Sequence, residues 1–486
     1  MRAPQLLVKT LFLFAFYLSL SICRAQNDDS PPPKSVAIQT VDRFKVDSLK
    51  TLDLTSAIEQ ALRANYNQNQ RDLDQKILDL NWKDTKESFW LPQLSLSLQT
   101  SDQRIGRLKS GGSETGTSKD VNGSLSLGFQ DYVIFNWGKD YLAYLNQRES
   151  YKRSTREFKE QRRALRHTTI IKYFELNYLK KIVEIYRKQL RNTSFVYRFT
   201  REKVATKKVN KQEYYQARSE YLRAQNSFQE VSNRLRIAEE EMAFHIADPP
   251  GTRYLLKDKL NYQKLQMPLS EAEEIAQKTS PDILESSKDV NNAKRSYQIQ
   301  QRENLPLPKF SVNLGAYARE FGPGVQTTRF NSGINGNHID VRASINAVWS
   351  ITGRGGVLNA RATKNRALLR KRSFSELAEA KHLSLSQVQR SYYRIRTYEQ
   401  QIRILEASSI TNNKTFDLIM ENYLKRKTAY INFSDSLLEA VNSDTALAES
   451  YYLHTREKIL LAQEMGVDEL PGKNFESLGI PLGSDE

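Results

Sequence analysis

The residue types that most often carry out chemistry in proteins are few in this 486-residue chain and lie far apart. No pair at i, i+4 spacing and no HExxH motif occurs among the five histidines, which are His167, His245, His338, His382 and His454. A surface or packing role is therefore favoured over metal ligation. The single cysteine, Cys23, excludes a disulfide framework and a CxxC zinc site. No P-loop or nucleophile motif is present, so the sequence predicts no catalytic residue, no metal site and no cofactor.

Charged residues are much more abundant than these. Lys and Arg number 73 against 56 Asp and Glu, a net charge of +17. The basic residues are spread along the chain, for example at Arg162–Arg166, Lys207–Lys208 and Arg370–Arg372. They could form solvated helix faces, or a basic surface that attracts anionic cargo or an acidic partner protein. Their spread, together with a secretory N-terminus, argues against a nucleic-acid-binding protein.

The N-terminus has the pattern of a secretory signal. Residues 1–25 contain a basic start, Arg2 and Lys9, and an apolar core, Leu11–Ile22. Small residues before Gln26 favour cleavage after Ala25, but Leu20–Cys23 resembles a lipobox in which Cys23 would be acylated. An uncleaved anchor is a third option. Residues 26–53 are polar and are expected to form a flexible segment.

The distribution of Gly and Pro predicts two very long helical segments. Neither residue occurs from Lys139 to Asp248 or from Val357 to Met465, and both residue types break helices. Beyond the N-terminus, no apolar run approaches the roughly 18–20 residues of a membrane helix. The mean hydropathy of −0.63 agrees with this, and a multi-span helical membrane protein is excluded.

The chain reads as a duplication, with repeat 1 at 54–268, repeat 2 at 269–466 and a tail at 467–486. Pro92–Leu98 matches Pro308–Leu314, for example. Each repeat begins with a predicted helix of about 35 residues, Thr55–Trp90 and Ser270–Asn304, that starts at Ser or Thr and ends at a proline. A period this long indicates gene duplication within one architecture.

Each repeat then contains two segments in which apolar and small or polar residues alternate. Leu94, Leu96 and Leu98 are one such set. Period two predicts β-strands, at about 93–102 and 122–132 in repeat 1 and about 309–319 and 339–350 in repeat 2. Their length of about ten residues is that of a tilted membrane-spanning strand.

Each repeat ends in a predicted helical hairpin, at 139–248 and 357–465, with a turn near 205–209 or 428–431. Two capping boxes mark the turns, Asn210 with Glu213 and Asn432 with Asp435. The ascending arms carry heptad seams, from Ala217 to Met242 and from Leu438 to Ala462. At 1.5 Å per residue, a descending arm of about 65 residues would be about 100 Å long.

Four membrane-type strands cannot close a barrel, because the smallest known barrel has eight. An open sheet in lipid would leave its edge N–H and C=O groups unpaired. Three copies would supply twelve strands. The sequence therefore predicts a mainly α protein with membrane β-structure: a trimeric 12-stranded β-barrel continued by a long α-helical barrel.

From about Thr51 to Gly466 the chain resembles the TolC-like outer-membrane efflux proteins. The resemblance rests on the duplicated helix–strand–strand–hairpin order, the strand entries Leu91-Pro92 and Pro308, and the hairpin turns. It implies a homotrimeric, passive exit duct of a tripartite efflux or type I secretion system. The barrel would lie in outer-membrane lipid and most of the chain in the periplasm. The tip would dock a periplasmic adaptor that serves an inner-membrane transporter, and would open by movement of its helices.

The resemblance also suggests functional residues. Relatives often have a carboxylate ring at the tip, for which Asp435 and Glu439 are candidates; the alternative is a capping or surface role. Candidate adaptor contacts at the two turns are Lys207, Lys208, Val209, Asn210, Glu213, Ala429, Tyr430 and Asn432. Trp90, Trp137 and Trp349 end strands, and could form an aromatic belt at the membrane interface or pack at the strand–helix junction.

Two other classes of protein share part of this pattern. One is a periplasmic coiled-coil scaffold or adaptor without a pore, and the other is a secreted fibre of long helices. Neither needs the pair of alternating ten-residue segments in each repeat, so the channel is the leading hypothesis.

Overall fold

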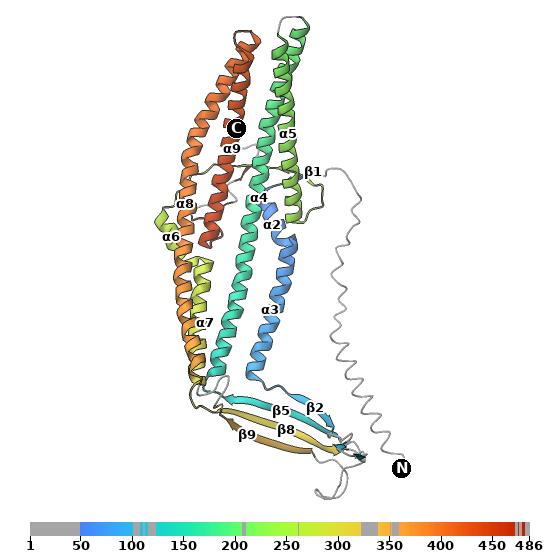
Figure 1. Cartoon of the computed structure of the whole chain (residues 1–486), viewed down its shortest axis with the longest axis vertical. Helices are drawn as coiled ribbons and strands as arrows, with labels where there is room; N and C mark the ends of the chain where they lie inside the picture. Colours follow the sequence, from blue (N-terminus) through green and yellow to red (C-terminus); the bar gives the residue numbers. More distant parts are fainter. Residues whose placement is uncertain are drawn as a thin grey trace.

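The computed structural model describes residues 49–100, 107–109, 112–114, 123–206, 210–260, 262–321, 339–349, 351, 359–471, 475 and 479–481. The predicted order, a helical segment, a strand pair and a long helical hairpin, occurs twice and is confirmed. The molecule is elongated, with the sheet at one end and the far ends of the long helices at the other (Figure 1). Cys23 and residues 1–48 lie outside the described residues. The prediction of a flexible segment up to residue 53 is wrong at its end, because Leu49–Leu52 pairs with a later strand. None of the described helices combines the length and the apolarity that a membrane span requires.

A four-stranded antiparallel sheet forms the lower end of the molecule in Figure 1, in the order β2-β5-β8-β9. Its strands are β2 (Ser95–Thr100), β5 (Gly123–Phe135), β8 (Lys309–Phe321) and β9 (Ile339–Val348). The two repeats join through β5 and β8, where Gly128 pairs with Gly315. A Cβ atom on Gly128 would collide with the backbone of Leu314 and Gly315, so this close pairing needs glycine.

A β-bulge extends β5 three residues beyond the predicted strand end. The register shifts between Phe129 and Tyr132, and Asp131 adopts a left-handed φ of 52° while its N–H donates to Asn313 Oδ1. Because the bulge adds one residue to β5, side chains three positions apart lie on the same face of the sheet. Phe129 and Tyr132 consequently lie on the same face, opposite Leu314 and Val312.

The prediction of one unbroken helix before each strand pair is wrong. The first region is α2 (Leu54–Ala64) and α3 (Tyr66–Trp90), and the second is α6 (Leu269–Thr279) and α7 (Pro281–Glu303). Asn65 ends α2 and caps α3 through Oδ1, while its Nδ2 donates to His245 O. Ser280 breaks the second region because the residue before a proline is driven out of the α conformation.

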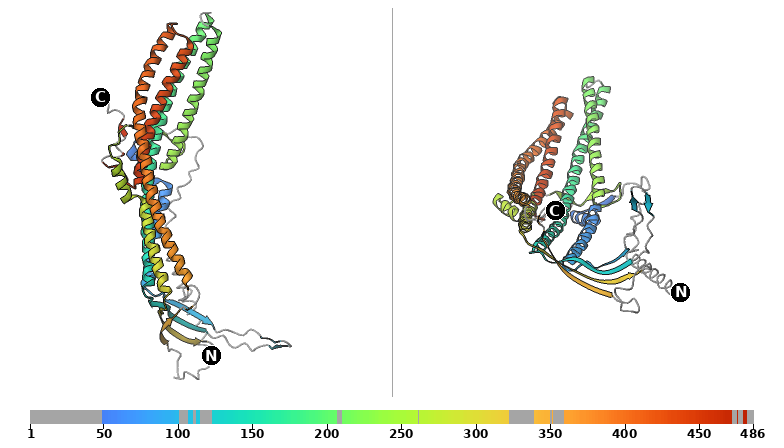
Figure 2. Two further views of the ribbon diagram at one scale, coloured as in Figure 1. Left: turned by 60° about the vertical axis from the view of Figure 1, so that its left-hand side comes forward. Right: turned by 60° about the horizontal axis from the view of Figure 1, so that its bottom comes forward.

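Two long hairpins run from the sheet to the far end of the molecule (Figures 1 and 2). Their arms are α4 (Lys139–Ala205) with α5 (Lys211–Ile246), and α8 (Ala360–Leu424) with α9 (Tyr430–Met465). α4 also packs against α9, which joins the hairpins. The predicted seam of α9 is wrong at its start: Leu438 is half exposed, whereas Leu437 and Ala440 are buried. α9 has neighbours on two sides and therefore buries a broader face than a single seam.

A belt of short strands crosses the helices near mid-length. β1 (Leu49–Leu52) pairs in parallel with β6 (Arg253–Leu256), and β7 (Asp258–Leu260) pairs with β10 (Gly479–Pro481). A tyrosine from each of the helices α4 and α8 donates a hydrogen bond to this region. Tyr173 OH donates to Asp258 Oδ2 at 2.8 Å, and Tyr392 OH donates to Met267 O at 3.3 Å. The belt connects the first described strand, the linker between the repeats and the C-terminal tail.

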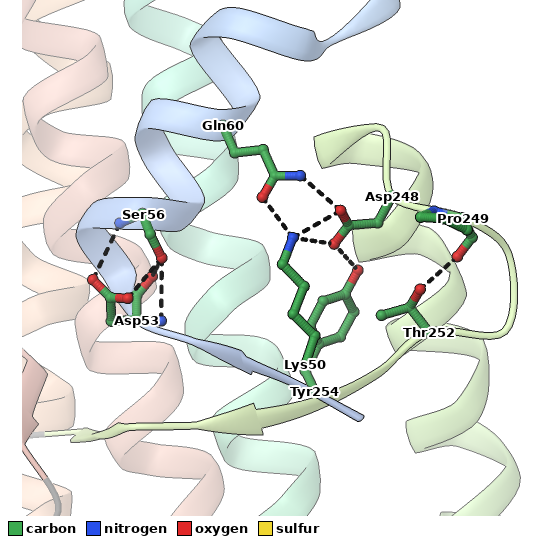
Figure 3. A network of polar contacts seen from close by, with 8 residues as sticks. All are labelled: Lys50, Asp53, Ser56, Gln60, Asp248, Pro249, Thr252 and Tyr254. Carbon is green, nitrogen blue, oxygen red and sulfur yellow. Dashed lines mark hydrogen bonds and ion pairs between the residues drawn. The ribbon is translucent and has the colours of Figure 1, made fainter. Parts of the chain in front are cut away.

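Asp248 is the polar centre of the belt (Figure 3). Both of its carboxylate oxygens lie 2.8 Å from Lys50 Nζ, and it also accepts from Gln60 Nε2 and Tyr254 OH. Its side chain is only 8% exposed. Because a buried carboxylate is costly unless it is paired and hydrogen-bonded, this site fixes β1 against the end of α5.

Some of the basic residues form ion pairs that stabilise the fold. Arg163 Nε pairs with Asp468 Oδ1 at 2.7 Å, and Arg166 pairs with Glu469. These contacts tie α4 to the chain that follows α9. The basic residues predicted as a solvated face near Arg162–Arg166 are therefore partly structural.

Candidate functional site

The sheet carries a continuous apolar face. Its pairings place Leu96 beside Leu127, Leu127 beside Ala316, and Ala316 beside Val341. The exposed fractions are 66% for Leu96, 40% for Leu314 and 74% for Ile345. An exposed apolar surface of this kind marks an interaction with membrane or protein.

The opposite face of the sheet is made of small and polar residues. Ser97 pairs with Ser126, Asn313 with Ser344, and Ser311 with Asn346. This division of side chains is that of a strand with lipid on one side and water on the other. Among the strands that the structure describes, β2 and β9 are each paired on one side only, so the described sheet of a single chain has two open edges.

The three tryptophans lie where the sheet meets the helices. Trp90 ends α3 and its carbonyl accepts from Tyr132 OH, whereas Trp137 Nε1 donates to Pro308 O at 2.9 Å. Trp349 follows β9 directly. They are 66%, 38% and 54% exposed, respectively. Only Trp137 anchors its ring N–H, whereas all three keep ring surface exposed, as an interface belt requires. The belt and the packing role both stay predictions.

The far ends of the hairpins are held together by an aromatic cluster. Phe416, Tyr423, Tyr430 and Phe433 are buried there, and Phe199 of α4 packs against Tyr423 with ring centroids 6.3 Å apart. Tyr430 was predicted as an adaptor contact, but it is only 8% exposed. Its side chain stabilises the inside of the tip.

A hydrogen bond joins the two hairpins at the tip. Tyr423 OH donates to Glu213 Oε1 at 2.6 Å. Burial raises the pKa of Tyr423, and its hydrogen bond to Glu213 raises it further, which keeps the phenol neutral as the donor. A hydrogen bond to a carboxylate contributes about 1.5–3 kcal/mol, so this pair favours the arrangement in which the hairpins lie together.

Both predicted capping boxes differ from the structure. Asn210 Oδ1 accepts from Gln212 N and caps α5, but the capping motif has no return bond from Glu213, which instead contacts Tyr423. α9 begins earlier than predicted, so Asn432 lies inside the helix and donates to Thr428 Oγ1. Ala429 occupies the cap position without a side-chain bond, and the capping role for Asp435 is wrong.

Asp435 and Glu439 lie one turn apart on α9 and are exposed. They line a shallow groove with Asn412, Thr415 and Ile419 of α8. Neither carboxylate has an ion-pair partner among the residues that the structure describes. The groove lies near the end of the second hairpin, where two uncompensated charges per chain are available. Lys207, Lys208 and Val209 lie outside the described residues.

The sequence interpretation named Glu213 and Tyr430 but missed Tyr423, which contacts both. A signal existed, since Phe416, Met420 and Tyr423 follow one another at spacings of four and three and predict a single helix face. The hydrogen bond itself could not be predicted, because it joins residues 210 positions apart.

Comparison with known proteins gives one family and one fold. Residues 84–246 match the model of the outer membrane efflux protein family, whereas no curated protein matches the chain. Among solved structures, Campylobacter jejuni CmeC, described as an outer membrane channel, is 14% identical with a TM-score of 0.69, covering 87% of this chain and 88% of its own.

Two further solved structures have the same fold. The outer membrane protein VceC of Vibrio cholerae is 14% identical with a TM-score of 0.67, covering 85% of this chain and 96% of its own. CusC, whose structures concern transmembrane channel formation, is 15% identical with a TM-score of 0.68, covering 88% and 96%. The predicted resemblance is thereby confirmed: the chain has the fold of the TolC-like outer-membrane channels, and a third of it matches the outer membrane efflux protein family.

Proposed function

We propose that this protein is the outer-membrane exit duct of a tripartite efflux or type I secretion system. The observation that carries the proposal is the sheet. It is apolar and exposed on one face and polar on the other, and in its described part both edges are open. Three copies would close twelve strands into a barrel, and the long hairpins would extend the pore through the periplasm. The protein is passive in this scheme, and the inner-membrane transporter supplies the energy.

The geometry favours this proposal over a periplasmic scaffold or adaptor without a pore. A protein that stays in water would leave Leu96, Leu127 and Ile345 exposed to solvent on one continuous face. Burial of that face contributes about 25 cal/mol per Å², and lipid provides it. The tryptophans at the border of the sheet fit the same environment.

At the tip, the Tyr423–Glu213 bond and the exposed carboxylates of Asp435 and Glu439 support a gate. Three copies would bring six such carboxylates around one axis, where a narrow pore concentrates their field. The tip would open when a periplasmic adaptor binds and the hairpins separate. Exposed candidates for this contact among the described residues are Asn210, Ala429 and Asn432.

A matched pair of substitutions on β9 tests the membrane assignment. Ile345→Arg places a charge on the apolar face and should abolish membrane insertion, because a lipid-facing Arg costs about 2–4 kcal/mol near the midplane in every copy of the assembly. Ser344→Arg is one residue away on the polar face and should insert normally. The readouts are membrane fractionation and single-channel conductance in a planar bilayer. Equal behaviour of the two variants, or a wild-type protein that is soluble without detergent, would exclude the duct.

A further inference from the structure

The two hairpin tips carry opposite charge. From Arg187 to Arg223, around the first turn, the sequence has eleven Lys and Arg against three Asp and Glu. From Glu406 to Asp444, around the second turn, it has four Lys and Arg against six Asp and Glu. The first tip therefore accounts for +8 of the net +17, and the duplication has not preserved this property.

The basic charge gathers beside stacked tyrosines. Tyr197 of α4 stacks on Tyr221 of α5, with centroids 5.4 Å apart and ring planes 6° apart, and it also contacts Tyr214 at 5.8 Å. Arg201 lies one turn from Tyr197, and Arg218 lies between Tyr214 and Tyr221 on the same side of α5. We call these five residues the Tyr–Arg face.

On both helices, the Tyr–Arg face lies on a different side from the one that meets the second hairpin. The side of α5 that meets the second hairpin carries Glu213, which accepts from Tyr423. On α4 that side carries Phe199, which packs against Tyr423. Successive residues of a helix are about 100° apart. Tyr197 and Arg201 are each two positions from Phe199 and lie on the other side of α4. Tyr214 follows Glu213 directly and points to a different side of α5. Residues of both arms form the face, so it covers the seam of the first hairpin.

The arginines of this face are available for binding. Arg201 and Arg218 are exposed, as is Arg198 beside them, and none has a carboxylate within ion-pair distance in the part of the chain that the structure describes. The hydrogen bond with Tyr197 raises the pKa of Tyr214, while the nearby charges of Arg218 and Arg201 oppose this shift. Along each helix the arginines lie about one turn from the tyrosines, on the same side, so one ligand can meet both.

We propose that the Tyr–Arg face docks an acidic segment of a periplasmic partner protein, and that exposed residues of the second hairpin, such as Ala429 and Asn432, contact other parts of that partner. The proposal rests on the proposed function and specifies its adaptor. Tyr and Arg are, with Trp, enriched at binding hot spots, and the planar fork of Arg matches a carboxylate. The acidic balance of the second tip would repel the same segment.

A second copy of this chain is the rival occupant. A neighbour in a closed ring would abut a flank of the hairpin formed by one arm, whereas the Tyr–Arg face spans both arms. The acidic partner is therefore favoured, and the copy becomes an outcome of the test.

Site-specific crosslinking in the native cell tests the proposal. The variant Tyr215→benzoylphenylalanine places a photo-reactive group at a side chain that is 61% exposed next to Arg218 and Tyr214. We expect a crosslink to a periplasmic protein, with Asp and Glu abundant in the crosslinked peptide identified by mass spectrometry. Adding Arg201→Glu and Arg218→Glu should lower the crosslink yield about tenfold or more. Adding Lys371→Glu and Lys381→Glu, exposed on α8 far from the tip, should leave the yield unchanged.

Charge exchange completes the test. Replacing carboxylates of the crosslinked peptide by Arg should restore the yield with the Arg201→Glu, Arg218→Glu variant. A crosslink to a second copy, a contact peptide without carboxylates, equal effects of the two charge reversals, or the absence of a crosslink would each overturn the proposal. Conductance of the same variants in a planar bilayer reports the pore separately, so a failed docking surface is distinguishable from a failed channel.

Discussion

At the scale of single residues, His245 shows how burial sets the charge of a side chain. It lies in the last turn of α5, and its Nε2 is 2.9 Å from Thr169 Oγ1. The Thr169 hydroxyl already donates to Leu165 O, so it accepts from His245 as the neutral Nε2–H form. Burial, and secondarily the charge of Lys172, lowers the pKa of His245 from 6.5 to about 4.

This shift predicts a loss of stability in mild acid. The unfolded chain binds the His245 proton below about pH 6.5, whereas the folded chain binds it only below about pH 4. The unfolded state therefore gains stability relative to the folded state as the pH falls through this window. We expect the melting temperature of the detergent-solubilised protein to fall between pH 7 and pH 4.5, and His245→Gln to flatten that fall.

His382→Gln is the matched control, because His382 is exposed on α8. It should leave the acid limb of the stability profile as steep as in the wild type. Identical acid limbs for wild type and His245→Gln would show that the imidazole does not contribute to the pH dependence.

At the scale of helices, Asn65 joins three elements. It ends α2, caps α3 by accepting from Asn67 N and Gln68 N, and donates to His245 O at the end of α5. Loss of an N-cap costs about 1 kcal/mol, and the unpaired buried carbonyl adds to this. We expect Asn65→Ala to speed amide hydrogen exchange in the first turn of α3 about tenfold. Asn67→Ala, at the exposed neighbouring position, should not; equal exchange in both variants would contradict the role of the cap.

The Tyr423–Glu213 bond makes a prediction about the relative position of the two hairpins. Tyr423→Phe and Glu213→Gln should each shift the tip toward its open form, because each removes or weakens the same charge-assisted bond. A contribution of about 1.5–3 kcal/mol corresponds to about tenfold or more in the ratio of open to closed tips. Single-channel recordings should show larger mean conductance for both variants.

The double variant and a control complete this test. Because both changes remove one interaction, their effects should not add. Glu202→Gln, at an exposed carboxylate near the same turn, should conduct as the wild type does. Additive effects, or unchanged conductance in every variant, would show that the bond does not restrain the tip.

Local signals in the sequence were sufficient for the element order, but long-range contacts decided the details. The absence of Gly and Pro predicted the long hairpins, and alternation predicted the strands, because both are local properties of the chain. The break at Pro281 also had a local signal that was overlooked. In contrast, Asn65 ends a helix through a contact with His245, 180 positions away, and no local pattern contains that information.

The candidate site also has features that local sequence signals predict and features that long-range contacts decide. The tryptophans and the apolar face follow from position along the strands, so they could be predicted. The capping boxes of Glu213 and Asp435 were local interpretations of residues whose environment is set by the other hairpin or by an earlier helix start. Tip residues depend on how two hairpins meet, and duplication does not fix that arrangement.

At the scale of the whole molecule, the two open edges of the sheet determine what can be stable in a membrane. In the described part of the sheet, β2 and β9 each have a neighbour on one side only. Every unpaired backbone group in lipid costs several kcal/mol. The apolar face and the open edges therefore belong to the same requirement: the sheet can enter lipid only when copies of the chain close it. Helix packing within one chain does not depend on this closure.

This predicts a coupling between assembly and sheet structure that can be measured without knowing the cargo. In mild detergent the native mass should be that of three chains. On heating, loss of β-structure should coincide with dissociation of the chains, and dilution should lower the midpoint of that transition by mass action. The helical signal should persist to a higher temperature, because α4, α5, α8 and α9 pack within each chain. A monomer that retains its sheet in detergent, or a midpoint that is independent of protein concentration, would show that the edges are not closed by other copies.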